Sequence, residues 1–112
     1  MPSIIDVDAL ETISKEHSDN KRVLRRDDLK LSLVSVRPRN SIPVHSHQIE
    51  DQVYYVLEGK GTITLDGEPF DLYPGVSVEI SPGVAHGVSN PFDTPLRYLD
   101  VFVDWGARRE TR

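Results

Sequence analysis

The stretch that decides the fold is His45-Ser-His47-Gln-Ile-Glu-Asp-Gln52-Val-Tyr-Tyr-Val-Leu-Glu-Gly59, in the middle of a chain of 112 residues. Two histidines stand two residues apart, and a run rich in aromatic and β-branched residues follows them and ends at a glycine. Residues two apart in an extended strand point to the same face, so His45 and His47 can share one ligand. On spacing alone, however, such a pair is more often a solvated strand face than a metal site.

Similar short runs, separated by Gly- and Pro-containing turns, recur on both sides of this stretch. They alternate with a period of two or are rich in β-branched and aromatic residues, which is typical of strands. Asp66-Gly67 predicts a two-residue type I′ hairpin turn, because both central positions of that turn need positive φ. The sequence therefore predicts an all-β domain, a sandwich or a barrel. The expected strands are residues 31–36, 52–57, 62–65, 69–72, 76–80, 86–89 and 96–103.

Composition limits the possible partners and chemistry. The chain contains no cysteine, so a metal has to be held by histidines, carboxylates or amides. Thirteen Lys and Arg against eighteen Asp and Glu give a net charge of −5, which argues against a nucleic-acid partner. The longest apolar run, Val53 to Leu57, is too short to cross a bilayer, and the first twenty residues lack a signal-peptide pattern. We expect a cytoplasmic protein with no nucleic-acid or membrane partner.

The two ends differ from the strand-rich middle. Residues 1–30 are expected to form an N-terminal arm with an edge strand or a short helical turn capped by Asp8. In this arm His17 lies in a polar run and is expected to be solvated. Residues 31–104 are expected to form the β-barrel, and residues 105–112 an Arg-rich C-terminal tail.

A second group of residues completes a pattern later in the chain, Gly75-x5-Ser81-Pro-Gly-x2-His86-x3-Asn90. Together with His45-x-His47-x4-Gln52-x6-Gly59, it resembles the two sequence motifs of the cupins. This resemblance implies a single-domain cupin, a double-stranded β-helix or jelly-roll barrel that often forms a homodimer through edge strands. It also implies that His45, His47, Gln52 and His86 converge on one divalent transition metal such as nickel, zinc, manganese or iron.

Gln52 stands where the cupins most often have Glu. Its amide oxygen can still bind a metal, but three imidazoles and an amide leave the full charge of the ion uncompensated. Such a site is a stronger Lewis acid, favours an anionic ligand and disfavours oxidation of the metal. Glu50 lies on the same strand face and is an alternative carboxylate ligand. The residues also have ordinary structural explanations: Gln52 as a strand-edge amide, and His86 as a core histidine bonded to a carbonyl.

The last predicted strand places Asp100 between Tyr98 and Phe102 on one face. A buried acid needs a partner or a use. Asp100 is therefore either a catalytic acid or base near the metal, or the ion-pair partner of an arginine. The candidate arginines are Arg37, Arg39 and Arg97. We expect Tyr54, Tyr98 and Phe102 to line the pocket.

The Gln-containing ligand set and the Asp100-x-Phe102 pair resemble the small cupins that linearise unsaturated ketouronates. In those proteins a later arginine assists the aspartate, but this chain has Gly106 there, so Arg108 or Arg109 would have to replace it. The sequence favours a metal-dependent enzyme with a small-molecule substrate. Its expected chemistry is non-redox: isomerisation, ring opening or cyclisation of a sugar-acid or keto metabolite. The alternatives are a quercetinase-like dioxygenase and a cupin that binds a sugar or another small ligand without turnover.

Overall fold

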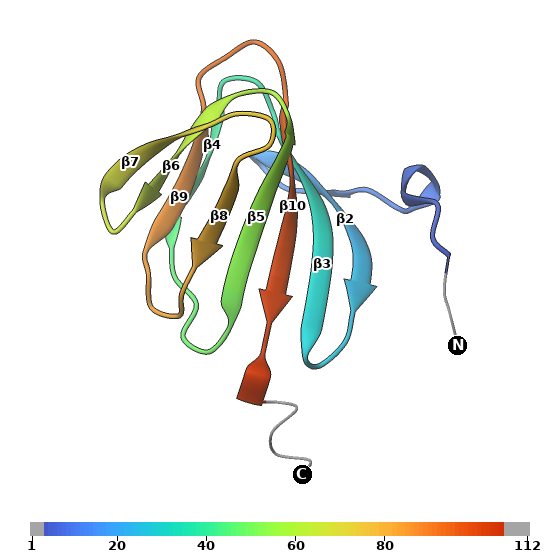
Figure 1. Ribbon diagram of the computed structural model, residues 1–112. Helices are drawn as coiled ribbons and strands as arrows, with labels where there is room; N and C mark the ends of the chain where they lie inside the picture. Colours follow the sequence, from blue (N-terminus) through green and yellow to red (C-terminus); the bar gives the residue numbers. More distant parts are fainter. Residues whose placement is uncertain (1–3, 107–112) are drawn as a thin grey trace.

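The computed structural model describes residues 4–106 and consists mainly of β-strands (Figure 1). Two antiparallel sheets face each other, and their strands are numbered in chain order. The elements are η1 (Val7–Ala9), β1 (Ile13–Ser14), β2 (Ser18–Arg25), β3 (Leu29–Val36), β4 (Asn40–His45), β5 (Asp51–Glu58), β6 (Gly61–Leu65), β7 (Glu68–Leu72), β8 (Ser77–Ile80), β9 (His86–Asn90) and β10 (Leu96–Val103). One sheet has the order β1-β2-β3-β10-β5-β8 and the other β4-β9-β6-β7. The predicted all-β jelly-roll fold is confirmed.

Each predicted strand corresponds to an observed one, namely β3 or one of β5 to β10. The predicted hairpin turn is also confirmed, because Asp66 and Gly67 have φ values of 49° and 85° and join β6 to β7. Both features depend on local chemistry. Alternating side chains define the strands, and the two positive φ values define the turn.

The N-terminal region contains a short helical turn, η1, and an edge strand, β1, and a further strand, β2, joins it to the sheet. β2 pairs with β3 from Ser18 to Arg25, so the sheet begins before residue 31, where the sequence placed the start of the barrel. The sequence did not reveal β2 because polar residues occupy its inward positions. β4 was missed because Pro43 interrupts it, and a proline is tolerated there since β4 is an edge strand. The cap of η1 is also not Asp8: the Asp6 carboxylate accepts from the Asp8 amide at 3.1 Å.

The core lies between the sheets and changes character along the strands. Val36, Val34 and Tyr98 are buried at one end of β3 and β10. Further along, the positions on the same face are Ser32, Asp100 and Phe102. The inward face thus turns from apolar to polar toward one end of the barrel, which is where a ligand can be bound.

Within residues 4–106, none of the helical segments has both the length and the apolar character needed to span a membrane. The cytoplasmic location therefore stays a prediction.

Gly59 at the end of β5 provides a test of the fold. Its φ is +83°, and a Cβ there would collide with the carbonyl oxygen of Pro95 and come within 3.0 Å of the Leu96 Cα. We expect Gly59→Ala to lower the free energy of unfolding by about 2–5 kcal/mol, since left-handed strain and overpacking act together.

Gly67→Ala is the matched control, because Gly67 has nearly the same φ, +85°, and nothing within 4 Å of its added Cβ. This variant should lose only about 1–2 kcal/mol, the cost of the backbone conformation. Urea unfolding of both proteins isolates the contribution of the close approach. Equal losses would show that the loop at Pro95 simply moves away.

Candidate functional site

Three histidines meet at the polar end of the barrel. His45 ends β4 and His86 begins β9, and the two are direct partners in the β4–β9 register. His47 follows two residues after β4 ends. The ring centroids are 4.3 Å apart for His45 and His86, 5.1 Å for His45 and His47, and 5.5 Å for His47 and His86. One nitrogen from each ring lies within 4.8 Å of the others, an arrangement that could hold one metal ion.

In two of these rings, a contact with a backbone carbonyl determines which nitrogen is free. The Nδ1 of His45 lies 2.8 Å from the Pro43 oxygen, and the Nδ1 of His86 lies 3.0 Å from the Val84 oxygen. A carbonyl oxygen can only accept, so Nδ1 carries the proton and Nε2 keeps its lone pair. Burial lowers the pKa of His47 and His86, which favours the neutral imidazole that a metal requires.

Gln52 adds a fourth acceptor. Its side chain is buried, and its Nε2 donates to the Asp100 carboxylate at 2.8 Å and to the Tyr54 hydroxyl at 3.3 Å. With Nε2 bonded to both groups, Oε1 is left as the atom without a partner within residues 4–106. Gln52 is therefore not an ordinary strand-edge amide.

Buried polar atoms without hydrogen-bond partners test whether a metal fits this site. The Nε2 of His47, the Nε2 of His86 and the Oε1 of Gln52 are buried and have no hydrogen-bond partner among residues 4–106. Such atoms are rare in folded proteins, and each needs an explanation. A cation satisfies all three, and imidazole nitrogens with an amide oxygen suit a divalent transition metal. The residues present therefore fit such an ion.

The structure does not support Glu50 as a ligand. Its carboxylate accepts from the Lys30 ammonium at 3.1 Å, and in the described part of the chain the metal-capable cluster contains only the three histidines among His, Cys, Asp and Glu. Asn90, the last residue of the second motif, is structural. Its side-chain amide donates to backbone oxygens of Val36, Arg37 and Thr94.

Asp100 lies beside this cluster in the centre of the six-stranded sheet. Burial raises its pKa to about 7, against the opposing effect of the Gln52 hydrogen bond. The alternative ion pair of Asp100 with Arg37, Arg39 or Arg97 does not form in the described part of the chain. Each candidate arginine has another acidic partner: Arg37 pairs with Asp19 at 2.7 Å, Arg39 with Asp93 at 2.8 Å and Arg97 with Glu58 at 3.2 Å.

A cavity of about 280 Å³ opens in front of these groups. Tyr54, Tyr98 and Phe102 line it, together with His45, His47, Gln52 and Asp100. The ring of Phe102 meets that of His47 edge-on at 4.9 Å, and the rings of Tyr54 and Tyr98 are 4.4 Å apart. The cavity thus has aromatic walls around a polar cluster, as small-molecule sites commonly do.

One wall of the cavity was missed from the sequence. Asn20, Arg22 and Arg25 of β2 line it, as do Lys15 and His17 before that strand. His17 is half-buried rather than solvated, with its Nδ1 2.9 Å from the Ser18 hydroxyl. The available signal was the period of two from Ser18 through Asn20 to Arg22, which places polar residues on one face of a strand.

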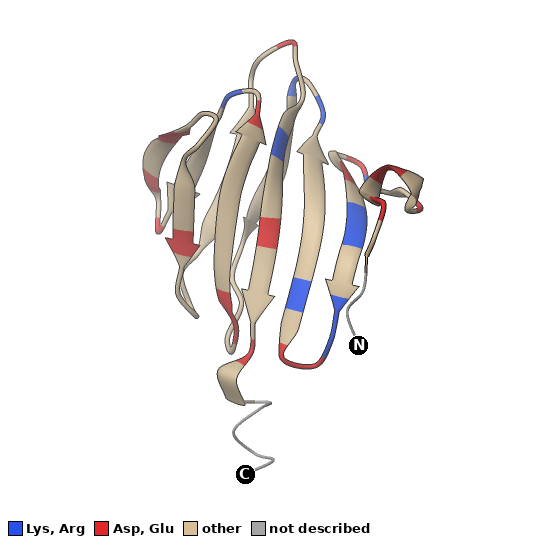
Figure 2. Ribbon diagram, turned by 45° about the vertical axis from the view of Figure 1, so that its right-hand side comes forward, with Lys and Arg blue, Asp and Glu red and all other residues tan. Residues whose placement is uncertain are grey.

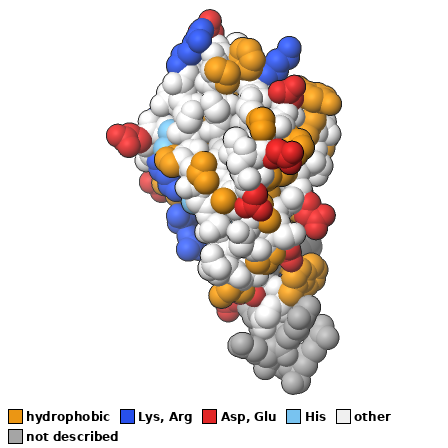
Figure 3. Space-filling view, turned by 90° about the vertical axis from the view of Figure 1, so that its left-hand side faces the viewer, with side chains coloured by type: hydrophobic (Ala, Val, Ile, Leu, Met, Phe, Trp, Pro, Cys, Tyr) orange, Lys and Arg blue, Asp and Glu red, His pale blue; other side chains and the backbone are white. Residues whose placement is uncertain are grey.

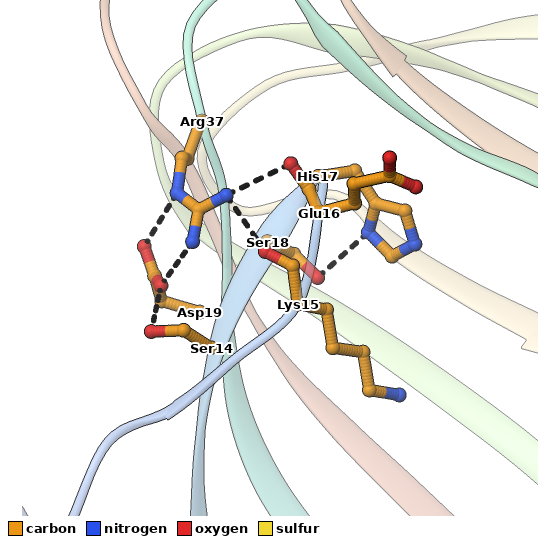
Figure 4. A network of polar contacts seen from close by, with 7 residues as sticks. All are labelled: Ser14, Lys15, Glu16, His17, Ser18, Asp19 and Arg37. Carbon is orange, nitrogen blue, oxygen red and sulfur yellow. Dashed lines mark hydrogen bonds and ion pairs between the residues drawn. The ribbon is translucent and has the colours of Figure 1, made fainter.

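Arg37 holds this wall in place (Figure 4). Its guanidinium donates to the carbonyl oxygens of Lys15 and Glu16 at 2.7 and 2.9 Å, and to both carboxylate oxygens of Asp19 at 3.2 and 2.7 Å. These bonds tie the segment before β2 to the end of β3, at the edge of the cavity. Arg108 and Arg109, the proposed replacements for the arginine absent at Gly106, lie outside the described residues.

Two curated proteins are similar to this chain in sequence. An oxalate-binding protein of Thermotoga maritima is 26% identical over 98 residues, which cover 88% of this chain and 76% of that protein. An uncharacterized protein of Methanocaldococcus jannaschii is 38% identical over 56 residues, 50% of this chain, so the match spans only 45% of that relative.

Solved structures show the same fold. KdgF from Halomonas sp. superposes with a TM-score of 0.86 at 21% identity, covering 97% of this chain and 99% of KdgF. A predicted oxalate decarboxylase from Thermotoga maritima gives 0.84 at 21% identity, covering 91% and 99%. The family model for the cupin domain matches residues 32–102, more than half of the sequence. The chain therefore belongs to the Cupin_2 family.

Proposed function

We propose that this cupin is a metal-dependent enzyme that performs non-redox chemistry, an isomerisation, ring opening or cyclisation, on a small sugar-acid or keto metabolite. One observation carries the proposal. Three buried polar atoms without hydrogen-bond partners within residues 4–106 belong to His47 and His86 of the histidine cluster and to Gln52, and His47 and Gln52 line a cavity together with Asp100. This arrangement provides a place for a cation and, next to it, a group that can move a proton.

His45, His47, His86 and Gln52 are the proposed ligands of one divalent transition ion, with nickel, zinc, manganese and iron as candidates. Such an ion, when bound, is a Lewis acid that polarises a carbonyl or ring oxygen. The four proposed ligands are neutral, so they do little to stabilise a higher oxidation state. This ligand set supports non-redox chemistry over the dioxygenase alternative.

Asp100 is the proposed acid and base. The Gln52 amide fixes its Oδ1, while Oδ2 has no hydrogen-bond partner within residues 4–106 and is left to exchange a proton with a substrate. The aromatic rings of Tyr54, Tyr98 and Phe102 narrow the cavity around the carboxylate. They would hold a small ring or chain near it and limit the entry of water.

Ligand binding without turnover is the second candidate, because one curated relative is named an oxalate-binding protein. Both candidates need the same metal site, and they differ in whether a product forms. The homodimer implied by the family resemblance stays a prediction.

The metal site is tested by elemental analysis of gently purified, untagged protein. We expect about one equivalent of a divalent transition metal, which His86→Ala should lose. The affinity should fall by more than the roughly 10- to 100-fold caused by losing an outer-shell partner, because a direct ligand is removed. Gln52→Ala should weaken binding as well.

His17→Ala is the control, since His17 lines the cavity but does not belong to the histidine cluster. It should keep its metal. Folded wild-type protein that stays metal-free after incubation with nickel, zinc, manganese and iron would refute the metal site.

Asp100→Asn tests the proposed proton transfer. The asparagine oxygen can still accept from Gln52, so the metal content should stay unchanged, whereas turnover should fall by roughly 10²- to 10⁴-fold. Unsaturated ketouronates, keto acids and flavonols are screened for product formation, with oxygen consumption followed in parallel. Equal activity of Asp100→Asn and wild type would remove Asp100 from the mechanism. Oxygen uptake coupled to product would instead indicate the dioxygenase.

A further inference from the structure

The cavity is cationic on the side formed by β2 and β3, although the chain as a whole carries a net charge of −5. Lys15, Arg22, Arg25 and Lys30 line it, and Asp100 is the one carboxylate among its described lining residues. Figure 2 shows Lys and Arg on β2 and β3, and a single acidic band on the neighbouring β10 of the same sheet, where Asp100 is the one acid. In the space-filling view, His reaches the surface with Lys and Arg side chains next to it (Figure 3).

Three of these four cations, Lys15, Arg22 and Arg25, have no acidic partner among the described residues. Lys30 pairs with Glu50 at 3.1 Å. The other arginines in this part of the chain all pair with an acid, Arg26 with Asp28 and the rest as described above. The unpaired arginines thus coincide with the cavity.

A β-bulge aims both arginines at the same space. Arg22 is opposite Ser32 and Arg25 is opposite Lys30, and the register of β2 against β3 shifts between Arg22 and Leu24. In a regular strand, residues three apart point to opposite faces, so Arg22 and Arg25 could not both face inward. The extra residue of the bulge removes this conflict, as bulges next to binding sites often do.

The sheet register also determines how far Arg22 lies from Asp100, the proposed acid and base. Arg22 is opposite Ser32, and Ser32 is opposite Asp100, so the three residues form one row across β2, β3 and β10. Two strand spacings separate the backbones of Arg22 and Asp100 by roughly 10 Å. The arginine side chain is long, so a group bound to it lies close enough to Asp100 for one small molecule to contact both residues.

Asn20 adds an acceptor to the same wall. Its Oδ1 is buried and has no hydrogen-bond partner within residues 4–106, and the residue lines the cavity. The wall therefore combines guanidinium donors for an anion with an unfilled acceptor for a hydroxyl group.

We propose that β2 carries the carboxylate-recognition site of this pocket. Arg22 binds the substrate carboxylate, with Arg25 and Lys15 beside it, and Asn20 accepts from a hydroxyl. The substrate extends from β2 to Asp100 and the histidine cluster, and it is a small hydroxy or keto acid rather than a neutral sugar. This inference rests on the proposed function and names its substrate class.

Calorimetric binding of D-galacturonate and D-galactose, which differ by one carboxylate, tests the proposal. Protein loaded with one equivalent of Ni²⁺ should bind galacturonate at least roughly 10-fold more tightly than galactose, since a hydrogen bond between charged groups has about that effect. Arg22→Met should lose most of this preference while its metal content and galactose binding stay unchanged. Arg22→Lys should restore part of the preference.

Arg26→Met is the matched control, because it removes the same charge near the end of β2 from a residue that pairs with Asp28 and does not line the cavity. It should bind galacturonate like wild type. His86→Ala, verified as folded by circular dichroism, separates this proposal from the metal site. Without metal it should still prefer galacturonate, through Arg22.

Three results would overturn the β2 site. One is wild-type protein with no preference for galacturonate. Another is an Arg22→Met variant that keeps the full preference. The third is an Arg26→Met variant that loses as much as Arg22→Met, which would mean that only overall charge matters. All three leave the metal site intact, because metal content is measured separately.

Discussion

Buried polar atoms without hydrogen-bond partners are the constraint around which this barrel is organised. Each buried polar atom that lacks a partner costs about 1–3 kcal/mol, and His47, His86 and Gln52 contribute one such atom each. Their sum is a large fraction of the roughly 5–15 kcal/mol by which a domain is normally stable. The apolar residues at the other end of the barrel have to offset this cost. Binding of a cation would remove it, so metal affinity and folding stability should be linked in this protein.

Asp100 connects the proposed metal site to the proposed proton transfer. By accepting from the Gln52 amide nitrogen, its carboxylate turns the amide oxygen away from itself, so that this oxygen remains free as a ligand. The same hydrogen bond fixes one carboxylate oxygen and leaves the other for a substrate. A glutamate at position 52 would bring a second negative charge next to Asp100 and could not donate this hydrogen bond when ionised. Glutamine at position 52, in place of the glutamate that cupins most often have, is therefore compatible with the neighbouring Asp100.

What the sequence could predict depended on whether the signal was local. Strands with alternating apolar residues and the Asp66-Gly67 turn were predicted, since both follow from neighbouring residues. β2 was not, because its inward residues, including Asn20 and Arg22, are polar and a bulge breaks their period. The three histidines were found as a motif. The hydrogen bond between Asp100 and Gln52 was not predicted from the sequence, because it depends on the pairing of β10 with β5.

Net charge is a poor guide to this pocket. A chain with a charge of −5 repels anions at long range, but screening limits that effect to about 10 Å at moderate salt. Unpaired cations that line a cavity act on a ligand at contact. Gln52 leaves the proposed metal site without a protein carboxylate, and β2 supplies Arg22 and Arg25 without acidic partners. Both features leave positive charge in the cavity that the protein itself does not neutralise. Their common physical explanation is a substrate that brings the negative charge with it.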